Sequence, residues 1–236
     1  MIIANDYQPQ EVKRVYNRRS WIYSKTVAPM EWEYHLHALD QASIQPGEKV
    51  LEVAVGPGLT LLELSRRVGE DTMIYGMDIS TSMLQLTEQR LRTNGFSRFQ
   101  LKEGNARQLP FEDEAFDVLY NGYMLDLIPE KDMPGILTEF RRVLRPGGRM
   151  ILLNMSKLNH QVAIFREKLY QWLPPTLVLY VMGGCRPVLM EEPVRNAGFI
   201  QVQRTYIDGK APSEIILATK PVGETTTKVA WEINKQ

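Results

Sequence analysis

The alternation of two patterns between residues 49 and 155 constrains the fold of this chain more than any other feature. Five apolar runs have the length of β-strands, namely KVLEVAV, TMIYGMD, RFQLKEG, FDVLYNG and RMILLNM. Most of them are separated by segments in which apolar residues have helical spacing, such as LTLLELSRRVG and STSMLQLTEQRLRTNG. Strands that alternate with helices are joined by right-handed βαβ crossovers. The sequence therefore predicts an α/β fold whose mostly parallel sheet has helices on both faces.

The segments that flank this alternation have different patterns. Before residue 46, PQEVKRVYNRRSWIYSK and PMEWEYHLHALDQASI predict two helices. After residue 155, HQVAIFREKLYQWLPPTLVLYVMGG predicts a helical insertion, RPVLMEEPVRNAGF a further helix, and IQVQRTYID and SEIILATK a closing hairpin. We therefore expect an N-terminal helical lid at residues 1–45, a main domain at 46–220 with an insertion at about 156–185, and a C-terminal tail at 221–236.

The composition limits the partners and the compartment. The chain has 28 Lys and Arg residues and 28 Asp and Glu residues, and this zero net charge argues against nucleic acid as a partner. Its one cysteine, Cys185, cannot form an internal disulfide, and no Cys/His spacing predicts a metal site. His35 and His37 would lie on different faces of a helix. Because MIIANDYQPQ has no signal pattern, we expect a cytoplasmic protein, and the apolar run LYQWLPPTLVLYVMGG leaves peripheral membrane contact open.

The first apolar run ends at a Gly-Pro-Gly break and contains an acid, Glu52. A strand that ends in a glycine-rich turn and opens a helix brings backbone N–H groups close to a ligand. The next apolar run ends in Asp78, at about the spacing at which an acid binds ribose hydroxyls in such units. Asp78 could instead be the N-cap of the helix that follows. We favour the ribose interpretation, which predicts a ligand of the nucleotide type.

Two later segments, GNARQLPFEDEAFDVLYNGYMLDLIP and RRVLRPGGRMILL, complete an ordered set of four motifs. Over about residues 45–155 the set resembles the class I S-adenosylmethionine-dependent methyltransferases. The GNA, LPF and FDV elements resemble the ubiquinone/menaquinone biosynthesis C-methyltransferases, whereas VYNRRSWIYS and NGYMLDLIPEKD resemble bacterial phosphatidylethanolamine N-methyltransferases. The resemblance implies a Rossmann-like sheet with an antiparallel last strand, and S-adenosyl-L-methionine as the cofactor.

The resemblance also assigns residues to a cofactor site. It implies that Glu52 orients the glycine-rich loop and approaches the methionine amino group, and that the Thr60 hydroxyl reaches the methionine carboxylate. Asp78 corresponds to the acid that binds the ribose, and Ile79 lies against the adenine. The other positions are Ala54 in place of the first glycine, Gly56 and Gly58 at the later glycine positions, Asn105 and Ala106 at the adenine edge, and Gly122 beside the methyl-donor channel.

Transfer of a methyl group from a sulfonium depends mainly on alignment and on the exclusion of water. A base is required only where the acceptor must lose a proton. Four residues near the expected site could act on an acceptor, namely Tyr16, Tyr23, Tyr123 and Asp126. For Asp126 we prefer a solvated loop acid or a helix cap to a base, and for the tyrosines the alternative is amphipathic packing with the hydroxyl at the surface. The sequence thus leaves the catalytic residue unknown.

The function expected from the sequence is methyl transfer to a small lipophilic acceptor, either a quinone precursor or a phospholipid headgroup. The basic and aromatic segment EVKRVYNRRSWIYSK suits such an acceptor, but it fits a core helix with a solvated basic face equally well. Alternatives are methylation of a soluble secondary metabolite and a non-catalytic cofactor-binding or regulatory protein. A nicotinamide-dependent oxidoreductase is disfavoured because G-x-G-x-x-G is absent. The sequence leaves both a monomer and a homodimer open.

Overall fold

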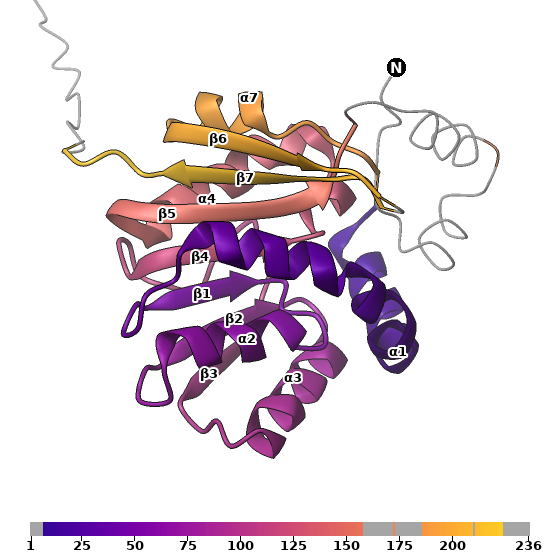
Figure 1. Ribbon diagram of the computed structural model, residues 1–236. Coiled ribbons are helices and arrows are strands. Elements are labelled where there is room, and N and C mark those ends of the chain that lie inside the picture. The colour runs from indigo at the N-terminus through magenta and orange to yellow at the C-terminus, as the bar shows by residue number, and fades with distance from the viewer. Residues whose placement is uncertain (1–6, 158–171, 173–185, 210, 224–236) are drawn as a thin grey trace, which may run out of the picture.

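The computed structural model describes residues 7–157, 172, 186–209 and 211–223. Its centre is a seven-stranded sheet in the order β3-β2-β1-β4-β5-β7-β6 (Figure 1). β7 is antiparallel to both of its neighbours, and the other strand pairs are parallel. This arrangement confirms the predicted α/β sheet with an antiparallel last strand. The strands are β1 (Val50–Val53), β2 (Ile74–Asp78), β3 (Phe99–Glu103), β4 (Phe116–Gly122), β5 (Leu144–Met155), β6 (Ile200–Ile207) and β7 (Ser213–Thr219).

Helices cover both faces of the sheet, as the sequence predicts. Successive side chains of a strand point to opposite faces, so Leu51 and Val53 of β1 pack with α4 and α7 on one face. Val50 packs with α1, α2 and α3 on the other face, which is the front of the sheet in Figure 1. The helices are α1 (Pro9–Ala42), α2 (Leu59–Val68), α3 (Thr81–Thr93), α4 (Met133–Val143) and α7 (Glu191–Asn196), with 3₁₀ turns η1 (Leu125–Leu127) and η2 (Glu130–Asp132) after β4.

The two helices predicted before residue 46 form one helix, α1, which continues through Pro29. A proline inside a helix removes one backbone hydrogen bond and bends the helix without always ending it. In Figure 1 the part of α1 after the bend runs across the face of the sheet, whereas the part before it lies beside the end of the sheet. Ala38, Leu39 and Ala42 anchor the second part in the core. The first part contacts the start of α3, where the Ser80 hydroxyl donates to Asn17 Oδ1 at 2.7 Å.

The Arg-Pro-Gly-Gly segment, which the sequence predicts to end a helix, belongs instead to β5. The pairing of β4 with β5 shifts register between Phe116 and Val118, and this irregularity accommodates the extra residues. The predicted closing hairpin is confirmed by the antiparallel pair β6 and β7. The helix predicted to end at Gly198 is present as α7, and Gly198 has the positive φ of a helix-terminating glycine.

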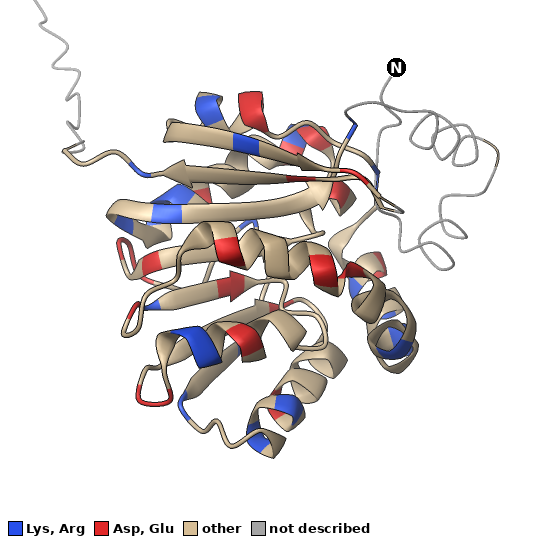
Figure 2. Cartoon of the chain, in the orientation of Figure 1, with Lys and Arg blue, Asp and Glu red and all other residues tan. Residues whose placement is uncertain are grey.

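Most of the predicted insertion at about 156–185, and the tail beyond residue 223, lie outside the described residues. Within the described part of the chain, no helix combines the length and the apolar composition that crossing a membrane requires. Figure 2 shows that basic and acidic residues are interspersed along the strands and helices that face the viewer. This distribution agrees with the balanced charge of the sequence.

Candidate functional site

A cleft runs along the carboxyl ends of β1, β2 and β4. It consists of three adjoining cavities that share lining residues, and Ala54 lines all of them. The strand order reverses between β1 and β4, and ligands of open α/β sheets bind at this switch point. Nine of the ten predicted cofactor residues line the cleft, namely Glu52, Ala54, Gly56, Thr60, Asp78, Ile79, Asn105, Ala106 and Gly122.

Gly58, the tenth predicted residue, does not line the cleft. Its φ is 78°, and a Cβ placed on it would lie 2.8 Å from three atoms of Thr87 on α3. Gly58 therefore allows the loop after β1 to pack against α3. Gly56 has a φ of 51° and open space where a Cβ would be, so its own glycine requirement is conformational.

Asp78 ties the glycine-rich loop to the start of α3. Its carboxylate accepts hydrogen bonds from the backbone N–H of Gly56 at 2.9 Å and of Ser80 at 2.8 Å. The N-cap of α3 is Ser80, whose hydroxyl accepts from the N–H of Met83, so the alternative interpretation of Asp78 as the cap is wrong. Burial raises the pKa of Asp78 to about 6, although its backbone hydrogen bonds lower it.

Ala54 adopts a left-handed conformation with a φ of 64°. The resemblance places a glycine here, and the backbone has the geometry that favours one. The N–H groups of Ala54 and Val55 both donate to the carbonyl of Met77, at 2.7 and 3.1 Å. These bonds join the ends of β1 and β2 and hold the strained residue in place.

Glu52 lies at the polar end of the cleft and is 2% exposed. Burial raises the pKa of its carboxyl well above the ordinary value, and the charge of Asp78 raises it further. Within the described structure, Glu52 Oε2 has no hydrogen-bond partner. A buried carboxylate needs a compensating donor or cation, so this atom fits the amino group of a zwitterionic ligand.

The opposite end of the cleft is mainly apolar. Val12, Met124 and Leu127 line it together with Ile79. Asn105 stands at its edge, where its side-chain oxygen accepts from the N–H of Arg107 at 3.1 Å and keeps a second lone pair for a ligand. This end suits a flat heterocycle with one polar edge.

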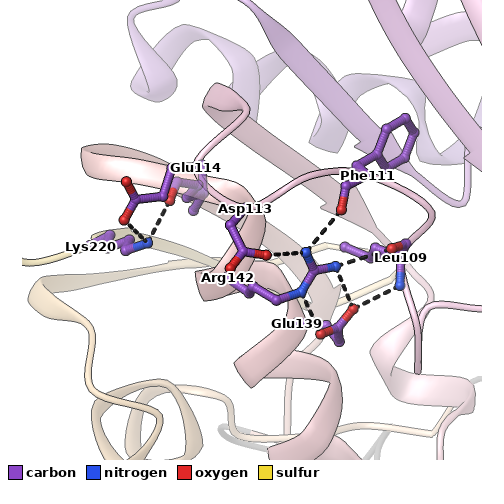
Figure 3. A network of polar contacts seen from close by, with 8 residues as sticks. Leu109, Phe111, Asp113, Glu114, Glu139, Arg142 and Lys220 are labelled. Atoms are coloured by element: carbon purple, nitrogen blue, oxygen red, sulfur yellow. Dashed lines mark hydrogen bonds and ion pairs between the residues drawn. The ribbon is translucent and has the colours of Figure 1, made fainter. Parts of the chain in front are cut away.

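The loop that carries Asn105 and Ala106 is held by α4 (Figure 3). The Arg142 guanidinium donates to the carbonyl oxygens of Leu109 and Phe111 at 3.0 and 2.9 Å. Glu139 pairs with Arg142 at 2.8 Å, and its Oε2 accepts from the N–H of Leu109 at 2.8 Å. Because the arginine fork fixes several acceptors in one geometry, it stabilises the conformation of the loop that carries Asn105 and Ala106.

Gly122 gives room to His35 of α1. A Cβ at Gly122 would lie 2.6 Å from His35 Cε1. His35 Nδ1 lies 2.7 Å from the Tyr120 hydroxyl and 3.1 Å from Thr60 Oγ1. Burial lowers the pKa of His35 to about 4, so the ring is neutral near pH 7. From the sequence, His35 was assessed only as a possible metal ligand. No group of three or more His, Cys, Asp or Glu side chains within the described ranges could hold a metal ion.

The structure rules out one interpretation of Tyr123 and one of Asp126 that the sequence left open. Both are buried, so the descriptions of Asp126 as a solvated acid and of the Tyr123 hydroxyl at the surface are wrong. The Tyr123 hydroxyl lies 2.8 Å from Ser213 Oγ, and Tyr123 has a φ of 48°. The carboxylate of Asp126 accepts from the N–H of Met155 at 3.4 Å. The segment after β4 thus turns the Tyr123 hydroxyl toward β7 and the Asp126 carboxylate toward the end of β5.

The lid residues Tyr16 and Tyr23 do line the cleft, with their rings 5.8 Å apart in an edge-to-face contact. Tyr23 also donates to Glu31 Oε2 at 2.7 Å. Glu31 lines the same polar cavity as Glu52, and the sequence analysis missed it. Glu31 follows Tyr23 by about two helical turns, and this spacing could have indicated that the two side chains lie on the same face of the helix.

A family model described as the ubiE/COQ5 methyltransferase family matches residues 6–183. The demethylmenaquinone methyltransferase of Bacillus subtilis (strain 168) is 31% identical over 156 residues, which cover 64% of this chain and 66% of that protein. That of Symbiobacterium thermophilum is 33% identical over 168 residues, or 66% of each chain. The chain thus spans just under two thirds of the length of these relatives.

Solved structures share the fold at low identity. A SAM dependent methyltransferase from Aquifex aeolicus has a TM-score of 0.61 and 18% identity, over 91% of this chain and 100% of that one. A putative methyltransferase of Haloferax volcanii, in complex with the Trm112 activator, has a TM-score of 0.69 and 16% identity, over 90% and 98%. The family match, the sheet order and the motifs agree with one another. The chain therefore belongs to the ubiE/COQ5 methyltransferase family and has the class I methyltransferase fold.

Proposed function

We propose that this enzyme methylates a ring carbon of a small, lipophilic hydroquinone. The observation that carries this proposal is the wall of the cleft next to the end of β4, where Val12, Tyr16 and Tyr23 of α1 face Met124 and Leu127. Aromatic and apolar side chains of this kind enclose a flat ring. The names of the demethylmenaquinone methyltransferases among its relatives support a naphthohydroquinone.

We propose further that the predicted residues lining the cleft hold the cofactor. Glu52 would bind the amino group and Thr60 would face the carboxylate of the methionine part. Asp78 would bind the ribose, while Ile79 and the Asn105-Ala106 pair would contact the adenine. The unpartnered Oε2 of Glu52 supports this orientation because a buried carboxylate oxygen needs a donor, which the ammonium group would supply. When bound, the cofactor supplies an electrophilic methyl group, and the protein aligns the acceptor and excludes water.

A phospholipid headgroup amine is the second candidate acceptor. The charge of Asp126 acts on Glu31, so two acids lie near one another beside the lid. Carboxylates in a partly dehydrated cleft attract an ammonium group. The same acids would be less suited to an acceptor with an anionic headgroup alone.

Calorimetric titration with S-adenosylhomocysteine, with NADH as the control ligand, tests the cofactor site. Asp78→Asn is expected to weaken binding by about tenfold or more, because a hydrogen bond to a charged group is worth ~1.5–3 kcal/mol. Asp71→Asn, an exposed acid before the amino end of β2, is the matched control and should bind normally. Equal affinities of the two variants would contradict the role of Asp78.

The acceptor is tested with a labelled methyl donor. One arm contains a reduced demethylmenaquinone with a short side chain, and the other contains phosphatidylethanolamine vesicles. Label in the naphthohydroquinone supports the main proposal, and label in the lipid alone supports the second candidate. Cofactor binding without label in either arm would overturn both, and would favour a soluble acceptor or a non-catalytic role.

A further inference from the structure

Glu31 is an acid in the cleft to which the cofactor assignment gives no role. It lies on α1, directly after the bend at Pro29 and Met30, and lines the polar cavity together with Glu52 and Thr60. Its Oε2 accepts a hydrogen bond of 2.7 Å from the Tyr23 hydroxyl. In the described structure it forms no ion pair with Lys or Arg. A purely structural acid at a partly buried position would ordinarily have such a partner.

The surroundings of Glu31 place it on the acceptor side of the cleft. Tyr23, its hydrogen-bond donor, lines both the polar cavity and the aromatic one. The charge of Glu31 acts on Tyr123, Tyr120 and Asp126, which all belong to β4 or to the segment directly after it. The charge of Glu52 also acts on Tyr120, and Glu52 interacts in addition with Asp78 at the end of β2. The two acids therefore share Tyr120, while the Tyr23 hydrogen bond and the interactions with Tyr123 and Asp126 associate Glu31 with the acceptor side.

We propose that Glu31 is the general base that takes the proton from the hydroxyl of the methyl acceptor. This inference rests on the proposed function, because only an acceptor that must lose a proton requires a base. Tyr23 is the positioning residue, since its hydroxyl holds one carboxylate oxygen and leaves the other for the acceptor.

The reaction balances as follows. The acceptor's hydroxyl proton passes to the Glu31 carboxylate, and the adjacent ring carbon forms a bond to the methyl carbon. The methyl–sulfur bond breaks, and its electron pair remains on sulfur. The ring becomes aromatic again when the hydrogen on the methylated carbon leaves as a proton to water and Glu31 returns its proton to the oxygen. One proton is released for each methyl group transferred.

The titratable groups that surround Glu31 are less suited to this role. His35, on the same helix, shares its Nδ1 between the hydroxyls of Tyr120 and Thr60. Asp126 is fully buried and accepts from a backbone N–H of β5. Burial raises the pKa of Tyr123, so its hydroxyl stays protonated. For Glu31 itself, burial raises the pKa to about 7 despite the Tyr23 hydrogen bond, and a base with this pKa is ionised in part and accepts protons readily near neutral pH.

The test compares Glu31→Gln with Glu33→Gln, an exposed acid on the same helix. Both variants and the unaltered enzyme are assayed from pH 5.5 to 9 with a naphthohydroquinone that has an unsubstituted ring position. For the unaltered enzyme, kcat/KM should fall below an apparent pKa near 7. Glu31→Gln should lower kcat by about 10²-fold or more and abolish this acidic limb, while Glu33→Gln should retain both. The amide variant should still bind S-adenosylhomocysteine with unchanged affinity.

Glu31→Asp and Tyr23→Phe complete the series. The aspartate variant keeps a carboxylate and should retain the acidic limb at a lower rate. Tyr23→Phe should shift the apparent pKa of the acidic limb upward, because the Tyr23 hydrogen bond lowers the pKa of Glu31. The carboxyl group of Glu31 can also be titrated directly by isotope-edited infrared spectroscopy of the ligand-free protein.

The outcomes separate the two levels of the argument. No methylation of the hydroquinone by the unaltered enzyme overturns the proposed function, and with it the base. Methylation that Glu31→Gln leaves unchanged in rate and pH profile overturns the base alone. The base is also overturned if Glu31→Gln loses affinity for S-adenosylhomocysteine and Glu31→Asp lacks the acidic limb of the pH profile. Those two results together would assign Glu31 to cofactor binding.

Discussion

The backbone N–H of Gly56 donates to the Asp78 carboxylate at 2.9 Å, and this hydrogen bond joins the glycine-rich loop after β1 to the end of β2. The same carboxylate accepts from Ser80 at the start of α3. The acid that the resemblance assigns to ribose therefore also sets the shape of the loop. Ligand binding and local stability depend on the protonation state of the same group.

We expect the stability of the ligand-free protein to fall as the pH rises from about 4 to 7. Burial raises the pKa of Asp78 to about 6 and that of Glu214 to about 7. Each acid holds its proton more tightly in the folded than in the unfolded chain. The stability that it contributes is therefore complete below its pKa in the unfolded chain, and is lost as the pH rises through its pKa in the folded chain. Each unit of pKa difference corresponds to ~1.4 kcal/mol.

Urea unfolding across this pH range measures the effect. Glu214→Gln keeps an oxygen for the N–H of Met190, which donates to Glu214 Oε1 at 2.7 Å, and it removes the titration. The decrease in unfolding free energy between pH 4 and 7 should therefore be smaller in this variant. A slope identical to that of the unaltered protein would exclude Glu214 as a contributor.

Ala54→Gly should leave the unfolding free energy unchanged or raise it by up to ~1 kcal/mol. The left-handed φ of 64° costs an alanine ~1–2 kcal/mol, and glycine relieves this strain at an entropic cost of ~0.5–1 kcal/mol. Ala54→Val should destabilise the fold because a β-branched side chain tolerates this region poorly. Ala38→Gly, in α1, is the control and should lose ~1 kcal/mol or more. A comparable loss in Ala54→Gly would show that the strain is absent.

Gly56→Ala and Gly58→Ala form a matched pair in one loop. Both glycines have a positive φ, but only at Gly58 would a Cβ collide with Thr87. Gly58→Ala should therefore lose more unfolding free energy, ~3 kcal/mol against ~1 kcal/mol. Gly56→Ala should have the larger effect on S-adenosylhomocysteine affinity, because Gly56 lines the cleft. Chemical denaturation compares the loss of unfolding free energy in the two variants, and calorimetry compares their loss of ligand affinity. A larger loss of stability in Gly56→Ala, or a larger loss of affinity in Gly58→Ala, contradicts the packing described for this loop.

Arg142→Lys should loosen the loop at residues 104–113. A lysine cannot reproduce the fork that contacts Leu109, Phe111 and Glu139 together, so the loop amides should exchange hydrogen faster and S-adenosylhomocysteine should bind about 3–10-fold more weakly. Arg145→Lys is the control, because Arg145 is exposed and forms an ion pair with Asp117, away from the loop. Unchanged exchange at Leu109 in Arg142→Lys would refute this support.

Much of the fold was predictable because its signals are local. The apolar run around Leu51, the break at Gly56 and the acid at the end of β2 each occupy a few consecutive residues. Parallel strands bring their carboxyl ends to one edge, so the order of the motifs placed Glu52 and Asp78 together before any contact was known.

Long-range contacts account for what the sequence did not predict. The ring of His35 contacts the Tyr120 hydroxyl, 85 positions away. In this position the ring fills the space that a Cβ at Gly122 would need. The burial of Asp126 depends on β5 packing beside η1. Pro29 indicated a helix boundary, but core packing of the residues on its C-terminal side keeps α1 continuous. A local pattern does not record which distant partner stabilises such a segment.

The bend in α1 separates two kinds of structural constraint along one helix. After Pro29, Ala38, Leu39 and Ala42 are locked into the core, where a change in volume would destabilise the sheet. Before it, Val12, Tyr16 and Tyr23 line the cleft and do not belong to the two core clusters of the described structure. Substitutions at these cleft-lining positions should therefore disturb the fold less than substitutions in the core. A lineage can diversify what enters the cleft by changing about twenty residues at the front of a single helix while the remainder of the domain stays constant.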